Sequence, residues 1–522
     1  MRRKFLSVVL CVCMMLTMAP FAFATEGEDS GTPASVVAKI GDREYSTLQE
    51  AIEAATNTQT ITLLSDIDLA RTISVSNKTI TLNLAGYKLY NTADLWDQPA
   101  KDDDDNNWSL ISVRGAGNLT ITGNGTLQAK ENDCYAVDVQ DGSTLTIDNG
   151  TLVGNIHAVY VYEGTAYIKG GTYSVQQKYP QTGKGDEFVL NLYDTNRSNG
   201  TAKMTVTGGT FANFNPANCQ AEGANTNFCA EGYSTKQEDE NYTVMGPVAA
   251  IDEHNYATLS AAVDAVEAAD NKTVTLLKDV TEDLVIPADK TVTLDLNGKK
   301  LTNVSSNTIT NNGTLTITGE GTVDNVTHAK AAVWNNVGGT VIIDGGAYTR
   351  SAEASTSATN SGNNSYYVID NYGTLTINKG TFKFSDNSTG AFSSLIHNGW
   401  YDGSKNTSER NAVMTINDGN FTQGTGGKIT VKNDDYGELE IKGGVFTQPQ
   451  SNYYCVYNYN IAKISGGTIN GYVGNEYANA TCDKGLLEIS NKAVINGGIQ
   501  SRTKASQTSS NDQNLIKITD NA

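Results

Sequence analysis

The chain has 522 residues, a formal net charge of −20 and 18% charged residues, and it contains 50 glycines. The strong negative charge excludes nucleic acid as a natural partner, because phosphate backbones would be repelled. The glycine content and the apolar patterning described below exclude a disordered chain and favour a turn-rich, all-β protein.

The N-terminus has the pattern of a secretion signal. Met1-Arg2-Arg3-Lys4 precedes an apolar run from Phe5 to Phe23, which the small-x-small triplet Ala22-Phe23-Ala24 closes. We predict a signal peptide over residues 1–24, a linker over 25–35 and a secreted mature protein. No later apolar stretch reaches the roughly 18 residues of a spanning helix, so we expect no membrane insertion.

The mature chain contains two similar halves. Tyr45–Ala54 returns as Tyr256–Ala265, and Lys78–Leu82 returns as Lys290–Leu294 at a nearly constant offset. In each half a Ser or Thr precedes Leu and Ile or Val at helical spacing, which predicts one short helix that caps the open end of a stack of strands. We predict unit 1 over residues 36–246 and unit 2 over 247–522.

A short strand pattern recurs through both units. An apolar residue, a polar residue and then Ile or Val precede a glycine-rich corner, as in Leu119-Thr120-Ile121-Thr122-Gly123 and Met204-Thr205-Val206-Thr207-Gly208. Alternation sends the apolar side chains to one buried face, and glycine supplies the positive φ of the corner. A spacing in the low to middle twenties, lengthened by occasional insertions, predicts the coils of a parallel β-solenoid.

Two polar features in unit 1 are open to more than one interpretation. The acidic run Asp102, Asp103, Asp104 and Asp105 suits a hard cation such as Ca²⁺, but we interpret it as a solvated loop because like-charge runs are usually exposed. Cys219 and Cys229 flank a polar loop and are candidates for a disulfide, with free thiols as the alternative. We expect no cofactor.

Aromatic residues in or beside the insertions of unit 2 are the candidate ligand contacts, because exposed rings stack on sugar faces. The alternative is that part of the Tyr453–Tyr459 run fills the core, since strands alternate in and out. The candidates are Tyr366, Tyr367, Trp400, Tyr401, Tyr453, Tyr454 and Tyr457.

No catalytic constellation is visible. Arginine is scarce, and the Gly-His-Gly and Arg-Ile-Lys tripeptides of polygalacturonase-like hydrolases are missing. We interpret the four histidines as single polar residues in insertions or on outer faces. They are His157, His254, His328 and His397.

The opening helix and the recurring strands resemble the pectate-lyase-like superfamily of right-handed parallel β-helices. Within it the chain is most similar to the pectate-lyase-like adhesive domains of Gram-positive bacterial surfaces. The resemblance implies a cell-surface location and a non-catalytic adhesin or structural module that binds a glycan or a host or neighbouring-cell surface. The alternatives are a polysaccharide lyase or glycoside hydrolase with an atypical site, because one fold hosts both uses, and a glycan-binding accessory region of a larger enzyme.

Overall fold

The structure is a computed structural model that describes residues 35–96, 108–177, 188–219, 222–223, 226–268, 270–351, 367–384, 394–400, 411–425, 427–476, 485–502 and 514–519. The predicted signal peptide over residues 1–24 and nearly all of the predicted linker lie outside the described residues, as does the acidic run at 102–105.

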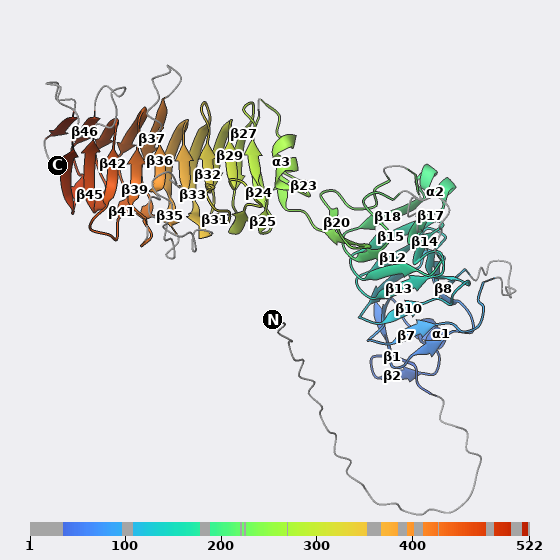
Figure 1. The fold of residues 1–522 in the computed structure, drawn as a ribbon. Coiled ribbons are helices and arrows are strands. Elements are labelled where there is room, and N and C mark those ends of the chain that lie inside the picture. Colours follow the sequence, from blue (N-terminus) through green and yellow to red (C-terminus); the bar gives the residue numbers. More distant parts are fainter. Residues whose placement is uncertain are drawn as a thin grey trace, which may run out of the picture.

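Figure 1 shows two stacks of strands, and the first stack, over residues 38–245, contains three sheets. One eight-stranded sheet has the order β18 (Ala202–Val206), β15 (Gly164–Ile168), β12 (Ser143–Ile147), β9 (Asn118–Thr122), β6 (Thr79–Asn83), β3 (Gln59–Leu63), β1 (Ala38–Ile40) and β2 (Arg43–Tyr45). The other eight-stranded sheet has the order β20 (Ser234–Glu238), β21 (Asn241–Met245), β19 (Thr210–Ala212), β16 (Thr172–Val175), β13 (Thr151–Gly154), β10 (Thr126–Gln128), β7 (Lys88–Tyr90) and β4 (Ile67–Asp68). The third sheet, which we name the first side sheet, has the order β17 (Leu190–Leu192), β14 (Val159–Val161), β11 (Tyr135–Val139), β8 (Ser109–Arg114) and β5 (Ile73–Ser76).

The second stack, over residues 249–518, contains two sheets. The larger has 19 strands in chain order, β22 (Ala249–Ile251), β23 (His254–Tyr256), β24 (Asn271–Leu276), β25 (Val280–Thr281), β27 (Thr291–Asp295), β28 (Lys299–Thr302), β30 (Thr314–Thr318), β31 (Gly321–Asn325), β33 (Thr340–Arg350), β35 (Thr374–Phe384), β37 (Ala412–Ile416), β38 (Asn420–Thr422), β40 (Gly437–Ile441), β41 (Val445–Thr447), β43 (Ile461–Ile464), β44 (Thr468–Asn470), β46 (Gly485–Ile489), β47 (Val494–Ile495) and β49 (Asn514–Ile518). The smaller, named the second side sheet, has the order β26 (Leu284–Ile286), β29 (Ile309–Asn311), β32 (Val333–Asn335), β34 (Ile369–Asn371), β36 (Ser394–Asn398), β39 (Ile429–Asn433), β42 (Tyr454–Asn458), β45 (Tyr472–Glu476) and β48 (Gly498–Arg502).

Most strands pair in parallel with a strand that follows several places later in the chain. In the first stack, β9 pairs with β12, β12 with β15 and β15 with β18, all in parallel. Antiparallel pairs occur at the ends, as between β20 and β21 or between β22 and β23. The chain is therefore an all-β protein built mainly from parallel sheets, as we predicted.

The predicted alternation of side chains decides which face of each strand is buried. In β30, Leu315 and Ile317 are fully buried, while the three threonines that alternate with them are partly exposed. Successive strands place such residues in register, so that Leu294, Ile317 and Ile343 lie in one row. Each stack has its own cluster of buried apolar residues, from Ala38 to Val244 in the first and from Ala249 to Ile489 in the second. Burial of these rows supplies most of the driving force for folding.

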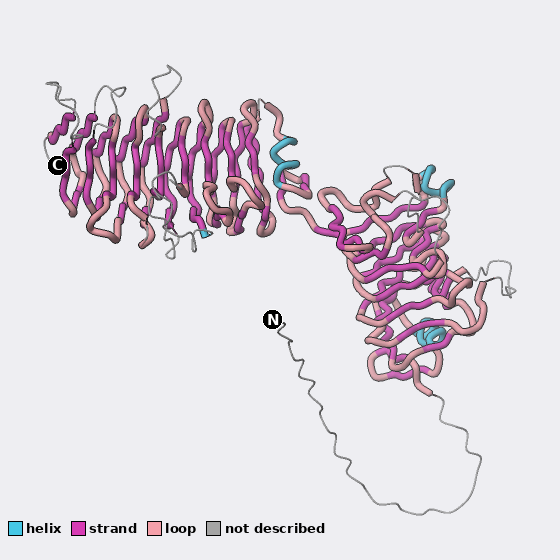
Figure 2. The backbone as a smooth tube through the Cα atoms, in the orientation of Figure 1, coloured by secondary structure: helices cyan, strands magenta, loops and turns pink. Residues whose placement is uncertain are grey.

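Both predicted cap helices are present, as α1 (Leu48–Ala54) and α3 (Leu259–Ala265), and a third helix, α2 (Asp194–Asn199), lies beside the first side sheet (Figure 2). The side chains of Thr47 and Thr258 accept N-cap hydrogen bonds, from the backbone N–H groups of Glu50 and Ala261. Lys78 and Lys290 donate to backbone carbonyls at the C-terminal ends of α1 and α3. The two stacks therefore open with the same device.

The interior of the second side sheet contains a row of buried asparagines. From each residue to the next, the amide Nδ2 donates to the amide Oδ1 at 2.7 to 2.8 Å. The row, named the asparagine row, consists of Asn311, Asn335, Asn371, Asn398, Asn433, Asn458 and Asn475.

Among the described residues no helix combines the length and the apolar character that a membrane crossing requires.

Candidate functional site

Four aromatic residues form a row at the second side sheet. The ring centroids of Trp334 and Tyr372 are 5.2 Å apart, those of Tyr372 and Trp400 are 5.3 Å apart, and those of Trp400 and Tyr436 are 6.4 Å apart. All four rings are partly exposed. We name this set the second-stack ring row. It contains Trp400, one of the predicted contacts.

Each ring is positioned by the strand beside it. Trp334 is the outward residue of β32, because its neighbours Val333 and Asn335 are buried, and its indole Nε1 donates to Asn336 Oδ1 at 2.6 Å. Tyr372 directly follows β34, and the backbone N–H of Trp400 donates to the carbonyl of Asp435 at 3.0 Å. The rings do not occupy one register position, because Trp334 is in register with Asp370, and Tyr372, Trp400 and Tyr436 lie just after β34, β36 and β39.

The other predicted contacts differ in their exposure. Tyr367 is buried and stacks on the imidazole of His397, with ring centroids 4.2 Å apart. Tyr457 is also buried, and its ring stacks on that of Tyr454. Tyr453 and Tyr454 are partly exposed, and the phenol of Tyr454 donates to Gln500 Oε1 at 2.8 Å. Tyr366 and Tyr401 lie outside the described residues.

A buried charge cluster lies next to the second-stack ring row. Asp370, His397 and Lys432 occupy the same outward position on β34, β36 and β39. Imidazole Nδ1 of His397 is 2.6 Å from Asp370 Oδ1, and its Nε2 is 3.2 Å from Asp434 Oδ2. Lys432 Nζ is 2.5 Å from the same Asp434 oxygen. Our prediction that His397 is a single polar residue was wrong, because stacking brings together charges that are far apart in the sequence.

Electrostatics inside this cluster outweigh burial. Burial alone lowers the pKa of His397, but the two carboxylates reverse that effect and raise its pKa above the ordinary value. Burial raises the pKa of Asp434, yet Lys432 and His397 together hold its pKa below the ordinary value. The side chains of all four residues, Asp370, His397, Lys432 and Asp434, are each at most 9% exposed. The cluster is therefore a compensated charge network and not a surface that a polymer contacts.

A second group of rings, which sequence analysis missed, lies on the outer side of the first side sheet. Tyr160 is the outward residue of β14. Its centroid is 5.3 Å from that of Tyr135 and 6.4 Å from that of Trp108. We name this group the first-stack ring cluster. Its members are Trp96, Trp108, Tyr135, Tyr160, Tyr162 and Tyr193.

The signal for this cluster was present in the sequence. The segment Val159-Tyr160-Val161-Tyr162 alternates apolar and aromatic residues, so both tyrosines point away from the buried valines. The contributions of Trp96 and Trp108 depend on tertiary contacts and could not be read from local spacing.

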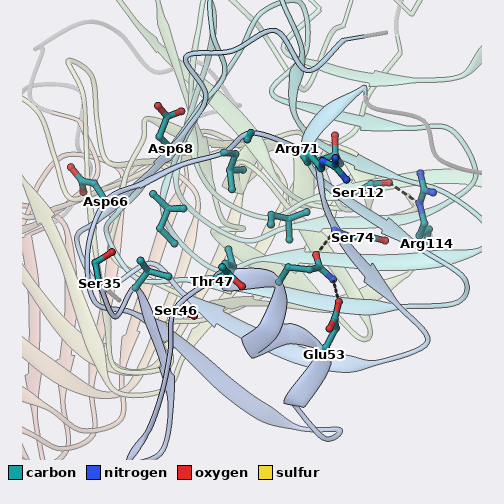
Figure 3. Close-up of a pocket in the computed structure, with 18 residues that line it drawn as sticks. Ser35, Ser46, Thr47, Glu53, Asp66, Asp68, Arg71, Ser74, Ser112 and Arg114 are labelled. Carbon is teal, nitrogen blue, oxygen red and sulfur yellow. Dashed lines mark hydrogen bonds between the residues drawn. The ribbon is translucent and has the colours of Figure 1, made fainter. Parts of the chain in front are cut away.

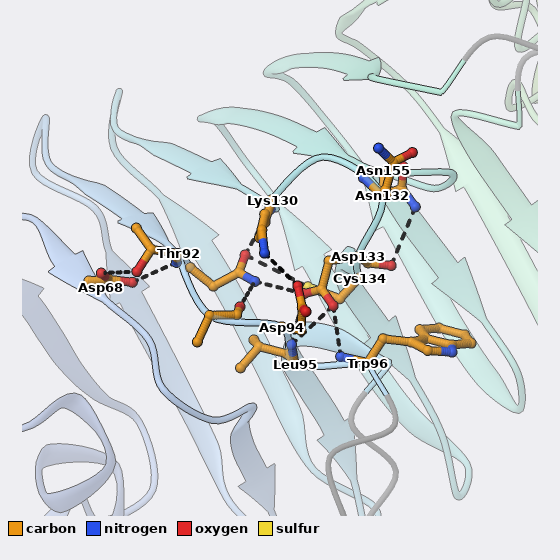
Figure 4. A network of polar contacts seen from close by, with 12 residues as sticks. Asp68, Thr92, Asp94, Leu95, Trp96, Lys130, Asn132, Asp133, Cys134 and Asn155 are labelled. Atoms are coloured by element: carbon orange, nitrogen blue, oxygen red, sulfur yellow. Dashed lines mark hydrogen bonds and ion pairs between the residues drawn. The ribbon is translucent and has the colours of Figure 1, made fainter.

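A hydrogen-bond network holds Trp96 in this cluster (Figure 4). The carboxylate of Asp133 accepts from the backbone N–H groups of Leu95 and Trp96, at distances between 2.9 and 3.0 Å. It also accepts from Asn91 Nδ2 at 2.7 Å. Asp133 and Asn91 are buried, so these bonds are shielded from water. The network fixes the backbone that carries the indole.

Buried polar groups also lie beneath the rings. Asp138, in register with Tyr160, is fully buried and accepts from Ser109, Ser112 and Gln140. Burial raises its pKa, although these hydrogen bonds and Arg114 act in the opposite direction. His157 is likewise buried, and burial lowers its pKa to about 4. Our placement of His157 in an insertion or on an outer face was therefore wrong.

Of the two alternatives for Cys219 and Cys229, a disulfide or free thiols, the structure has free thiols. The backbone of Cys219 bridges to Thr226, whereas that of Cys229 bridges to Val206. The two cysteines are thus held by different partners. Burial raises the pKa of Cys229 to about 11, so this thiol is not activated as a nucleophile.

Within the described residues, no group of three or more His, Cys, Asp or Glu side chains is arranged to hold a metal ion. Comparisons of the chain with family models, with curated proteins and with solved structures find no match.

Proposed function

We propose that the chain is a secreted, non-catalytic protein that lies on the surface of a bacterium and binds glycans. In this proposal its strands wind as a right-handed parallel β-helix, and its role is that of the pectate-lyase-like adhesive domains that its sequence resembles. The stack is the scaffold, and the ligand contacts lie on the side sheets.

The second-stack ring row carries the proposal. Three intervals of 5.2 to 6.4 Å between ring centroids make a strip of partly exposed aromatic surface that crosses several strands. Aromatic rings bury a large area at a low entropic cost and pack against the apolar faces of sugars. A strip that runs along the stack suits an extended polymer better than a small molecule.

Burial of the charge cluster supports a non-catalytic role. The cluster contains an acid–base pair, His397 and Asp370, but a glycosidic bond would have to reach side chains that are at most 5% exposed. General acid–base catalysis requires hydrogen-bond contact with the reacting group. The alternative of a polysaccharide lyase or hydrolase is therefore best tested through its products.

Affinity electrophoresis of the mature chain through gels that contain neutral polysaccharides tests the binding. We expect Trp334→Ala and Trp400→Ala each to weaken the retarding interaction about tenfold, because tryptophans at the centre of an interface dominate affinity. Tyr167→Ala is the control, since Tyr167 is 43% exposed but lies on β15, away from the side sheets.

Mass spectrometry of the incubated polysaccharide completes the test. Unchanged chain lengths are expected. Shortened or unsaturated oligosaccharides would contradict the non-catalytic part of the proposal, and equal retardation of both tryptophan variants and wild type would contradict the assigned surface.

A further inference from the structure

A cavity of about 700 Å³ lies at the end of the first stack, between α1, the β4–β5 connection and β8 (Figure 3). Its volume falls within the range of small-molecule sites, about 300 to 1,000 Å³. Charged side chains of both signs line it, including Glu53, Asp66, Asp68, Arg71 and Arg114.

The cavity depends on a connection that differs between the two stacks. Residues 69–72 join β4 to β5 in the first stack, whereas only residues 282 and 283 join β25 to β26 in the second. In the second stack, Glu282 accepts hydrogen bonds from the backbone N–H groups of Leu259 and Ser260, at 2.9 and 2.8 Å. A carboxylate thus fills the corner beside α3. In the first stack the longer connection carries Arg71 and leaves the corner beside α1 open.

One wall of the cavity lies in register with a residue of the first-stack ring cluster. Ser74, Ser112, Asp138 and Tyr160 occupy the same position on β5, β8, β11 and β14, and the first two line the cavity. Adjacent strands lie about 4.8 Å apart and β11 lies between β8 and β14, so the backbone of Tyr160 is roughly 10 Å from that of Ser112. The sheet ends at β5, where α1 contacts it. A ligand that lies along the rings therefore meets α1 at this end.

The polar groups of the cavity suit a ligand that both donates and accepts hydrogen bonds. Arg71 is exposed and makes no side-chain hydrogen bond or ion pair with the described residues. Asp66 uses Oδ1 to accept from the backbone N–H of Lys88 at 2.8 Å, which leaves its second oxygen for a ligand. Sugar hydroxyl groups are both donors and acceptors. A carboxylated sugar would instead meet the acidic side of the cavity in a chain that has a net charge of −20.

We infer that this cavity binds the terminal sugar of a neutral glycan whose following sugars lie on the first-stack ring cluster. The inference rests on the proposed function and adds to it a second site that binds a different part of the glycan chain. The ring row of the second stack accepts the middle of a chain, and the cavity of the first stack accepts its end.

The test uses the full mature chain and compares each of four neutral polysaccharides, a β-1,3-glucan, an α-mannan, a β-1,4-galactan and a β-1,4-glucan, with acid fragments of the same polymer. The double variant Trp334→Ala/Trp400→Ala removes the second-stack ring row. Calorimetry then measures the remaining binding at equal polymer mass. For a site that binds chain ends, a fragment preparation with about tenfold shorter chains binds about tenfold more protein per gram.

Two substitutions probe the cavity in that double variant. We expect Arg71→Ala and Asp66→Asn each to weaken fragment binding about tenfold. Asp279→Asn is the matched control, because Asp279 accepts from the backbone N–H of Lys300 at 2.8 Å just as Asp66 accepts from Lys88. Arg43→Ala controls for the loss of one exposed arginine from the same stack.

The outcomes separate the two proposals. If wild type binds and the double variant does not, the proposed function stands and the cavity inference is overturned. Binding that follows polymer mass instead of the number of chain ends, or cavity variants that bind like their controls, also overturns the inference alone. If wild type binds none of the four polymers, both proposals fail.

Discussion

The two side sheets use the same strand geometry with opposite chemistry. On the first side sheet, the inward row at the ends of β5, β8, β11, β14 and β17 is apolar and consists of Val75, Val113, Val139, Val161 and Leu192. The corresponding row of the second side sheet begins at Ile286 and continues as the asparagine row.

The comparison shows that one parallel scaffold accepts two ways of filling its interior. Apolar side chains do not need a particular partner or orientation, because the hydrophobic effect has no direction and scales with the area buried. Each buried asparagine amide requires hydrogen-bond partners on both neighbouring strands. For example, Asn398 Nδ2 donates to Asn433 Oδ1, and Asn398 Oδ1 accepts from Asn371. A buried polar network that lacks some of its hydrogen-bond partners is less stable than an apolar core. The second row is therefore expected to be long and uninterrupted, as it is.

The largest effect should come from placing an amide in the apolar row. Val139→Asn puts a donor and an acceptor among valines that have no polar side chains to offer, so we expect the free energy of unfolding of the first stack to fall by about 4 kcal/mol. Hydrogen exchange followed by mass spectrometry measures the two stacks separately. A loss that spreads to the second stack would show that the two stacks unfold together.

Placing an apolar side chain in the asparagine row should lower the free energy of unfolding by a somewhat smaller amount. Asn398→Val leaves Asn433 Oδ1 without its donor and takes an acceptor from Asn371, and we expect a loss of about 3 kcal/mol confined to the second stack. Retention of the ring contacts, judged by the near-ultraviolet circular dichroism of the tryptophans, is the control for a local change. An unchanged denaturation midpoint would contradict the view that the asparagine row acts as one network.

Acidification should affect the stability of the two stacks differently, because their buried histidines have pKa shifts of opposite sign. The pKa of His157 is lowered to about 4, so its neutral form is favoured and stability falls as the pH drops below the unfolded value of 6.5. The pKa of His397 is raised, so its contribution is fully present below 6.5 and is lost as the pH rises through the folded value.

Paired variants measure this difference. Between pH 7 and pH 5, wild type should lose about 2 kcal/mol more first-stack stability than His157→Gln does. The cost of His397→Gln should instead be greatest at pH 5 and shrink as the pH is raised above 7. If the stability difference from wild type had the same pH dependence in both variants, the expected opposite effects of the two histidines would be contradicted.

The smallest effect should come from lengthening the asparagine row. The side-chain oxygen Oδ1 of Asn311 is buried and has no donor among the described residues. Ile286→Asn places an amide at the preceding position in register. The new hydrogen bond offsets the apolar area that is lost, so we expect a change of less than about 1 kcal/mol. A loss as large as that of Val139→Asn would show that the row cannot be extended.

Local patterns in the sequence predicted most of the strand architecture. Alternation in segments such as Thr314–Thr318 identified the buried faces, and the Ser and Thr residues before apolar helical spacing identified α1 and α3. These features depend on residues within a few positions of one another. For the candidate site, the position of Trp400 beside an insertion singled it out as a ligand contact, which stays a prediction, and the first-stack ring cluster was overlooked.

Spacing along the chain could not identify groups that meet across strands. Asp370, His397 and Asp434 touch only because stacking places their strands in register, and nothing in their local segments distinguishes them from solvated residues. The burial of Tyr367 against His397 has the same origin. The cavity beside α1 likewise depends on a difference of two residues between corresponding connections.

The sequence by itself thus determined the class of the protein, its recurring strands and its paired cap helices, because hydrophobic periodicity and capping are local properties of the chain. Tertiary structure alone decided which polar and aromatic side chains meet. Parallel stacking carries residues from distant segments to within one strand spacing of each other. Register set the asparagine row and the Asp370–His397–Lys432 contacts, and the connections beside the strands brought the rings together.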